Sequence, residues 1–181
     1  DKKATESIFI ENPTITGIIH FAAYKAVGES VEKPLDYYDN NLFSLVHLLQ
    51  MAVKYNAKHF IFSSSCTVYG NPESIPVTEN TPLQTAASPY GATKQMGETI
   101  VRDTAFTYPL STILLRYFNP VGAHESGLIG ESPLNKPNNI LPIICNSADT
   151  GEEMMVFGGD YDTRDGSCIR DYVHVSDIAE A

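Results

Sequence analysis

Two side chains near the middle of the chain are spaced to work as an acid–base pair. Tyr90 and Lys94 lie four residues apart at the start of a predicted helix, so they share one helix face. A nearby ammonium group stabilises a phenolate and lowers the pKa of the tyrosine, which can then act as a general base near neutral pH. The same spacing also arises by chance on solvated helix faces, so the pair alone is weak evidence of an active site.

A run of hydroxyl side chains gives this pair a context. Residues 63–67 read Ser-Ser-Ser-Cys-Thr and follow a short apolar segment that predicts a strand. Ligands of parallel α/β sheets bind beyond the carboxyl ends of the strands, so these hydroxyl groups could hydrogen-bond a substrate hydroxyl or the Tyr90 phenol. A serine-rich turn without a ligand is the simpler interpretation of the run taken alone.

The elements that must position these residues alternate between strands and helices. Apolar segments rich in β-branched and aromatic residues predict strands at 15–22, 59–63, 112–116 and 154–157. Apolar residues at three- and four-residue spacing predict a helix from Pro34, and Ser88 with Pro89 marks the start of another. Further helices are expected near 140–149 and after an N-cap at Ser176.

This order of elements indicates an α/β fold. Continuous apolar strands between helices are typical of a doubly wound parallel sheet, Rossmann-like and here partial, with helices on both faces. The loop-rich second half is expected to form part of a smaller C-terminal substrate-binding lobe. The chain starts without Met and stops one helical turn after Ser176, so we expect an internal piece of a longer protein that lacks both ends.

The composition excludes several classes of partner. The chain has 12 Lys and Arg against 22 Asp and Glu, a net charge of −10, which argues against nucleic acid and anionic membranes. No apolar run approaches the roughly 18 residues needed to span a bilayer. The three distant cysteines favour neither disulfides nor zinc, and the five histidines show no ligand spacing, so no metal site is expected. With no secretory leader visible, a cytoplasmic location is expected.

Several motifs resemble a known family. Phe62–Gly70 (FSSSCTVYG) and Ser88–Lys94 (SPYGATK) resemble the catalytic signatures of extended short-chain dehydrogenases/reductases. Five further motifs, in family order, resemble those of the UDP-glucose 4-epimerases within it: HFAAYKAVGES at 20–30, YYDNN at 37–41, LRYFNPVGAH at 115–124, PNN at 137–139 and RDYVHV at 170–175. The family's G-x-G-x-x-G fingerprint occurs nowhere among the 12 glycines, which fits a member lacking both ends.

The resemblance implies a reaction with assigned roles. It implies NAD-dependent epimerisation of UDP-glucose and UDP-galactose at C4, in which hydride leaves C4 for NAD⁺ and returns to the opposite face of a 4-keto sugar. Tyr90 would take the proton of the sugar 4-hydroxyl, and Ser65 would bind that hydroxyl. Lys94 would lower the pKa of Tyr90 and hold the nicotinamide ribose, so all three residues would also contact the cofactor.

Other positions match the family's contact residues. The resemblance implies that NAD is contacted by Phe21, Lys25, Asn40 and Phe118. It implies that the nucleotide sugar is held by Asn119, Asn139, Ile140, Phe157 and Arg170, beside Ser65 and Tyr90. Residues 1–118 would then form a partial NAD-binding domain and 119–181 a partial substrate-binding region. Simpler interpretations are a core Phe21, a solvated Lys25, and an Arg170 that pairs with Asp165 or Asp171 on the surface.

The sequence departs from the family pattern at two places and leaves alternatives open. Ala23-Tyr24 stands where Gly-Leu is common, and Tyr24 could crowd the cofactor loop; Cys66 stands where Ala is usual. A 4,6-dehydratase is disfavoured because no acidic residue follows Ser65. An epimerase for another UDP sugar and an inactive fragment stay open, and the isolated chain is expected to be inactive. The helix faces at 35–53 and 96–105 could form a homodimer or face the sheet.

Overall fold

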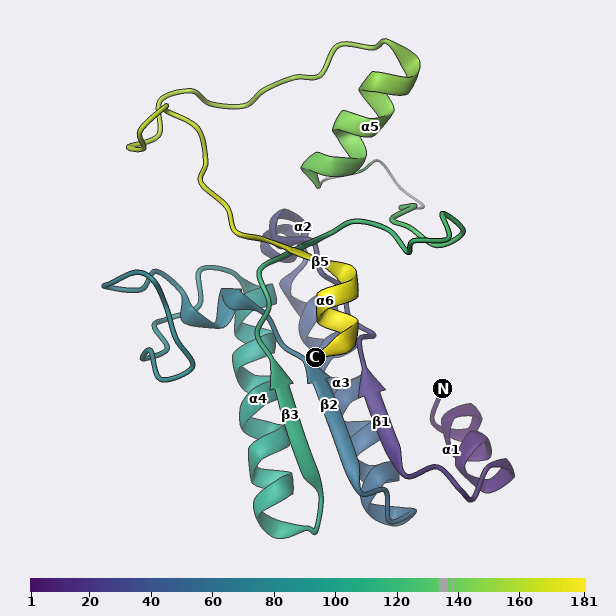
Figure 1. The fold of residues 1–181 in the computed structure, drawn as a ribbon. Coiled ribbons are helices and arrows are strands. Elements are labelled where there is room, and N and C mark those ends of the chain that lie inside the picture. Colours follow the sequence, from purple (N-terminus) through teal and green to yellow (C-terminus); the bar gives the residue numbers. More distant parts are fainter. Residues whose placement is uncertain (134–136, 138) are drawn as a thin grey trace. The chain divides into compact units, whose positions relative to one another are not determined.

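The computed structural model describes residues 1–133, 137 and 139–181. It divides the chain into two compact units, Asp1–Arg116 and Tyr117–Ala181, and each is described by itself. The first unit holds a three-stranded parallel sheet in the order β1-β2-β3, formed by Gly17–His20, His59–Ser63 and Ser111–Leu115 (Figure 1). The parallel α/β fold class predicted from the sequence is therefore confirmed.

Helices connect the strands, as parallel pairing requires. The unit contains α1 (Lys2–Glu11), α2 (Val27–Glu32), α3 (Pro34–Lys54), the 3₁₀ helix η1 (Cys66–Tyr69) and α4 (Pro89–Thr107). The predicted starts of α3 and α4 are confirmed, and the Ser88 hydroxyl accepts the Gly91 N–H at 3.1 Å. The sequence analysis missed α1, which Asp1 caps by accepting from the backbone of Lys3 and Ala4.

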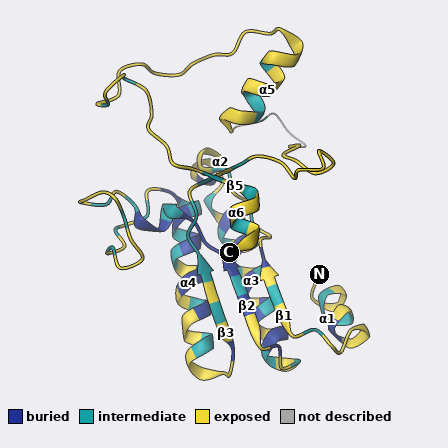
Figure 2. Ribbon diagram, viewed as in Figure 1, coloured by how far each residue is buried: buried dark blue, intermediate teal, exposed yellow. Residues whose placement is uncertain are grey.

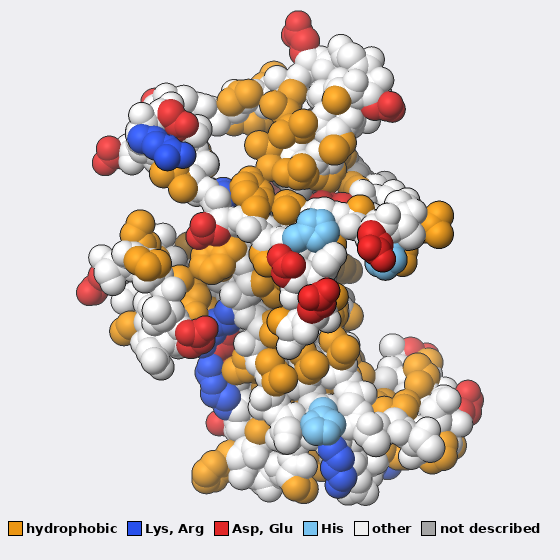
Figure 3. Space-filling model, viewed as in Figure 1, with side chains coloured by type: hydrophobic (Ala, Val, Ile, Leu, Met, Phe, Trp, Pro, Cys, Tyr) orange, Lys and Arg blue, Asp and Glu red, His pale blue; other side chains and the backbone are white. Residues whose placement is uncertain are grey.

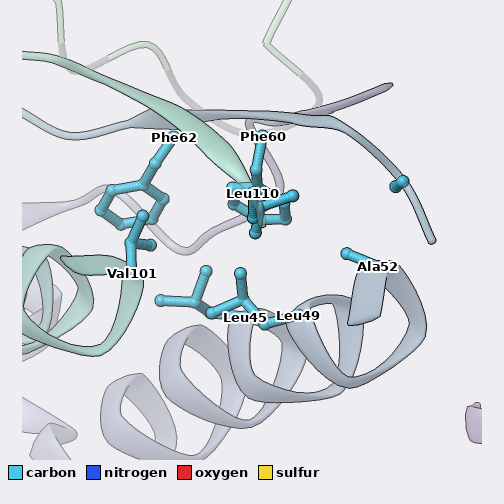
Figure 4. Close-up of a cluster of buried hydrophobic side chains, with 8 residues drawn as sticks. Leu45, Leu49, Ala52, Phe60, Phe62, Val101 and Leu110 are labelled. Carbon is cyan, nitrogen blue, oxygen red and sulfur yellow. The ribbon is translucent and has the colours of Figure 1, made fainter. Parts of the chain in front are cut away.

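The core lies between the sheet and the helices α3 and α4. Phe60 and Phe62 point from β2 toward these helices (Figure 4), and the buried strand residues are concentrated on β2 (Figure 2). The buried cluster consists of Leu45, Leu49, Ala52, Ala57, Phe60, Phe62, Val101 and Leu110.

Helices cover one face of this sheet in the described part of the unit, although the sequence predicts helices on both. The parallel register aligns Ile19, Ile61 and Ile113 in one row. Successive strand residues point to opposite faces, so this row lies on the face away from Phe60 and Phe62. Ile19 is 63% and Ile113 53% exposed. The strands are apolar on both faces, and this pattern is the reason why the sequence predicts helices on both.

Gly97 allows α4 to approach β2 closely. A Cβ at this position would lie 2.6 Å from Phe62 Cζ and 3.2 Å from Leu45 Cδ2. We expect Gly97→Ala to lower the free energy of unfolding, because overpacking costs roughly 1–3 kcal/mol while alanine gains about 1 kcal/mol in helix propensity. Urea denaturation measures the change. Gly28→Ala in α2 is the control, since a Cβ there meets nothing within 4 Å; an equal change in both variants would contradict the packing argument.

The second unit contains a two-stranded parallel sheet and two helices. Its elements are β4 (Asn119–Val121), α5 (Ile140–Thr150), β5 (Tyr172–His174) and α6 (Val175–Glu180), with β4 paired to β5. The helix predicted near 140–149 is confirmed as α5. Across the described residues of both units, no helix is long and apolar enough to cross a membrane.

Two predictions for this second unit are wrong. Residues 154–157 form no strand in the described structure, and Phe157 is 79% exposed. Apolar β-formers without a neighbouring strand leave their backbone groups unpaired, so composition alone does not make a strand here. The cap of α6 is His174 rather than Ser176, because His174 Nδ1 accepts the Ser176 N–H at 3.2 Å.

Candidate active site

The start of α4 meets the carboxyl end of β2 where the sequence predicts an acid–base pair. Lys94 is 4% exposed, and its Nζ donates to the Ser63 carbonyl oxygen at 2.6 Å. The same nitrogen lies 5.7 Å from the centre of the Tyr90 ring and 5.0 Å from that of Phe62. Lys94 therefore does not lie on a solvated helix face, which was the simpler interpretation of the pair.

Burial sets the charge behaviour of Lys94. Removal from water disfavours the ammonium form and lowers the pKa of Lys94 to about 8. The side chain is then charged for the most part at neutral pH but loses its proton far more readily than an exposed lysine. A positive charge in such a dry position acts strongly on its neighbours, since little water screens it.

Local bonds fix Tyr90 in the first turn of α4. The Ser88 cap and Pro89 set the helix start, so Tyr90 is the second helical residue and is half-buried. The Thr93 hydroxyl donates to the Tyr90 carbonyl oxygen at 2.7 Å. These contacts hold the Tyr90 backbone one turn before Lys94.

Two hydroxyl groups of the serine run, those of Ser64 and Ser65, have different hydrogen-bond partners. Ser65 is the N-cap of η1, and its Oγ accepts the Thr67 N–H at 3.2 Å, which leaves the Ser65 hydroxyl proton able to reach another acceptor. The Ser64 hydroxyl instead donates to Glu98 at 2.6 Å. The run is therefore more than a serine-rich turn, although Ser64 is committed to the protein interior.

Two of the predicted cofactor contacts, Phe21 and Lys25, lie on the loop after β1, and a third, Asn40, lies on α3. Phe21 is 55% exposed, so it does not belong to the core, and Lys25 is exposed as well. Asn40 is half-buried and donates to Asn41 at 2.9 Å. Tyr24, which the sequence analysis expected could crowd the loop, packs its ring against that of Tyr37, with ring centres 5.6 Å apart.

Asn41 is a residue of this region that the sequence analysis left without a role. Its side chain accepts the Tyr24 N–H at 2.8 Å and donates to the Tyr24 carbonyl at 3.1 Å. It also donates to the Thr93 hydroxyl on α4 at 3.1 Å. The signal was present in the sequence, because asparagine is mildly unfavourable inside a helix unless its amide has such partners.

The other predicted positions lie in the second unit. Asn119 donates through its side chain to the Asp171 carbonyl at 2.8 Å, and Asn139 donates to Glu131 at 2.6 Å. Arg170 is exposed and donates to the Ile169 carbonyl at 2.8 Å; within the described residues it forms no ion pair with Asp165 or Asp171. The remaining predicted positions of this unit, also exposed, are Phe118, Ile140 and Phe157. Asn138 of the PNN motif lies outside the described residues.

Comparison with known proteins shows the family of the chain. The family model described as the NAD dependent epimerase/dehydratase family matches residues 1–181. The chain belongs to the NAD dependent epimerase/dehydratase family. Proteins named UDP-glucose 4-epimerase from Caenorhabditis elegans and Haemophilus influenzae are 51% and 52% identical to it, over 99% of this chain and 52% and 53% of their own lengths.

A solved structure agrees with this membership of the NAD dependent epimerase/dehydratase family. The crystal structure of UDP-glucose 4-epimerase from Bifidobacterium longum in complex with NAD⁺ and UDP matches with a TM-score of 0.94 and 50% identity. The match covers 99% of this chain and 54% of that one. The chain thus spans about half the length of the relatives it matches.

Sequence reasoning also missed a buried charge cluster in this family member. Glu98 lies four residues after Lys94 on α4 and accepts bonds from Ser64 and Arg116. Burial by itself raises the pKa of Glu98, but the hydrogen bonds from Arg116 and Ser64 and the charges of Arg116 and Arg102 outweigh it and hold the pKa below its usual range. The available signal was an arginine at the end of an apolar strand, which needs a buried partner.

Proposed function

We propose that the protein containing this chain is a UDP-glucose 4-epimerase, which interconverts UDP-glucose and UDP-galactose with NAD as cofactor. The observation that carries the proposal is the arrangement of Tyr90, the buried Lys94 and Ser65 at the carboxyl end of β2. Relatives with this name share about half of the residues over 99% of the chain, which agrees with it.

The residues at this end of the sheet fit NAD. Lys25 offers a positive charge for phosphate and Phe21 an exposed ring for stacking, on the loop that Asn41 holds in place. Asn40 and Lys94 offer donors of the kind that bind ribose hydroxyls. When bound, NAD supplies the hydride acceptor and donor for C4 of the sugar.

The chain's own residues would handle the proton and the sugar oxygen. Tyr90 accepts the proton of the 4-hydroxyl, and the Lys94 ammonium stabilises the resulting negative charge near its ring. Ser65 hydrogen-bonds the same sugar oxygen through its hydroxyl. We assign the UDP sugar to positions of the second unit, namely Asn119, Asn139, Ile140, Phe157 and Arg170, with Phe118 beside the nicotinamide.

Product analysis tests this function. The complete natural protein is incubated with UDP-galactose, and the product is identified by mass and proton NMR. An epimerase gives UDP-glucose of unchanged mass, whereas a 4,6-dehydratase gives a product that has lost one water. Cys66 and Thr67 follow Ser65 at the start of η1, and neither is an acid for that elimination. Loss of water would overturn the proposal.

The choice of sugar is tested in the same assay. A UDP-Glc/GlcNAc 4-epimerase from Campylobacter jejuni matches this chain with 34% identity and a TM-score of 0.76. UDP-N-acetylgalactosamine is therefore the second substrate to offer. We expect faster conversion of UDP-galactose, in line with the higher identity to the UDP-glucose 4-epimerases.

Arg170→Ala is expected to raise KM for the UDP sugar. A charge-assisted bond to phosphate is worth roughly 1.5–3 kcal/mol, which corresponds to about a tenfold to hundredfold rise. The NAD content should stay unchanged, because the contact is to the substrate. Arg164→Ala, at another exposed arginine of the same loop, is the control. If titration gives equal UDP affinity for the wild type and Arg170→Ala, Arg170 has no part in substrate binding.

The protein is further proposed to form a homodimer through α3 and α4. Part of their apolar side chains faces the sheet, including Leu45 and Val101. Others line a groove of about 280 Å³ between the two helices, including Val46, Val53 and Ile100. An apolar groove of this kind suits a second copy of the same helices. Light scattering of the complete protein measures its mass, and a monomer at micromolar concentration would contradict the proposal.

The proposed setting is the cytoplasm, with no nucleic-acid partner. In the described structure Cys66, Cys145 and Cys168 form no disulfide, which suits a reducing compartment. The net charge is −10, and Lys and Arg side chains are scattered over the face drawn in Figure 3 rather than gathered into a basic patch. Phosphate backbones bind to clustered basic charge, so this surface does not favour them.

A further inference from the structure

Glu98 is a fully buried carboxylate that the proposed reaction does not use directly. It lies on α4 one turn after Lys94, and none of its side chain is exposed. Its oxygens accept from the Ser64 hydroxyl at 2.6 Å, from Arg102 at 2.7 Å, and from Arg116 at 2.7 and 2.6 Å. The carboxylate is therefore held by donors from three separate places in the chain.

Ser64 connects this carboxylate to both sides of the candidate active site. It follows Ser63, whose carbonyl oxygen accepts the Lys94 ammonium, and it precedes Ser65. Peptide units are planar, so a short buried bond at Ser64 restricts the direction of the Ser63 carbonyl and the path of the chain into Ser65. The Glu98–Ser64 bond thus couples α4 to the end of β2.

Arg116 brings the end of β3 and η1 into the same cluster. It directly follows β3 and forms a bidentate pair with Glu98. Its guanidinium lies 5.1 Å from the Tyr69 ring and donates to the Tyr69 hydroxyl at 3.3 Å. Tyr69 is the last residue of η1, the short helix that Ser65 caps. One carboxylate therefore links every element that carries Ser65, Tyr90 or Lys94.

Stability alone explains such a cluster poorly. Taking charges out of water costs nearly as much as their attraction returns, and apolar side chains of similar volume are often equally stabilising. What the cluster adds is direction, because a bidentate guanidinium and a short hydroxyl bond fix angles as well as distances. Catalytic groups depend on such fixed geometry.

We propose that Glu98 is a positioning residue that, through Ser64 and Arg116, keeps Ser65 and Lys94 in fixed positions relative to Tyr90. The proposal rests on the proposed function, which gives these three residues their use. It assigns Glu98 no contact with the substrate.

Ser64→Ala removes the link to the strand end and leaves both arginine pairs of Glu98 in place. In the complete natural protein, we expect kcat for UDP-galactose to fall by about tenfold to a hundredfold, as misplacement of catalytic groups does. KM should change little, because Ser64 faces Glu98 rather than the substrate. The NAD retained per protein after gel filtration should fall, since the carbonyl that orients Lys94 is loosened.

Arg102→Met is the matched control. Arg102 binds the same carboxylate from one turn further along the same helix and is half-exposed, so its bond does not link Glu98 to the strand end. The variant should lower the urea midpoint at least as much as Ser64→Ala and keep the wild-type kcat and NAD content. Wild-type kcat in Ser64→Ala, or a loss of kcat in Arg102→Met that follows its loss of stability, would overturn the positioning role.

The proposed function and the positioning role fail in different ways. If the wild type retains NAD but converts no UDP-galactose, the proposed function is wrong, and NAD retention then decides the positioning role. Ser64→Ala must still release NAD faster than Arg102→Met. Equal release from the two variants would overturn the role of Glu98.

Discussion

Tyr90→Phe is expected to lower kcat for UDP-galactose by about a hundredfold or more, because loss of a general base has effects of this size. Phenylalanine keeps the ring beside Lys94 but cannot accept the proton of the sugar 4-hydroxyl. The fold should survive, since the helix start depends on Ser88 and on backbone atoms rather than on the Tyr90 hydroxyl. Steady-state kinetics and far-UV circular dichroism of the purified variant measure both expectations.

Tyr108→Phe is the control for this experiment. Tyr108 is the C-cap of the same helix, at the end away from Tyr90, and is 46% exposed. Removing its hydroxyl should leave kcat unchanged. Near-wild-type turnover by a folded Tyr90→Phe protein would refute the role of Tyr90 as the base.

Lys94→Met is expected to reduce kcat by about a hundredfold, comparable to loss of acid–base assistance, and to weaken NAD retention. The substitution removes the charge near the Tyr90 ring and the donor at the Ser63 carbonyl. Lys58→Met is the control, because Lys58 is an exposed lysine that directly precedes β2, at its amino end. Wild-type NAD content together with wild-type kcat in Lys94→Met would contradict the assignment.

Lys94 also predicts a pH dependence of stability. Burial lowers the pKa of Lys94 in the folded protein to about 8, below the usual lysine value of 10.5. Between these two values the unfolded chain binds the proton and the folded chain does not, so the free energy of unfolding rises with pH, by about 3 kcal/mol in total. Urea denaturation at about pH 8 and at about pH 10.5 should show this rise in the wild type and not in Lys94→Met. The same slope in both proteins would show that another group titrates.

Local signals in the sequence were enough to predict most of the first unit. Ser88 and Pro89 cap and begin α4, and an apolar run at 59–63 forms β2, because each depends on residues next to one another. The helical repeat alone also predicts that Lys94 lies on the same face of α4 as Tyr90, one turn later. The burial of Lys94 could not be predicted in this way, because the Ser63 carbonyl oxygen that accepts its ammonium group belongs to another element, β2.

Contacts between distant residues were beyond the reach of sequence reasoning. The three-residue strands β4 and β5 exist because Asn119 and Tyr172 lie in register, and neither segment is long or apolar enough to signal a strand. The donors to Glu98 include Arg116, 18 residues away, and Ser64, 34 residues away. At 154–157 the composition favoured a strand, but no neighbouring strand pairs with it in the described structure.

Isotope retention at C4 tests the central claim most directly. The complete natural protein is given UDP-galactose that carries deuterium at C4, in ordinary water, and the UDP-glucose formed is analysed by NMR. Hydride held between the sugar and NAD does not exchange with water, whereas the proton handled by Tyr90 does. We predict UDP-glucose with the deuterium kept at C4. UDP-glucose with hydrogen at C4 would show that this position is inverted by removal of a proton, and would contradict the account.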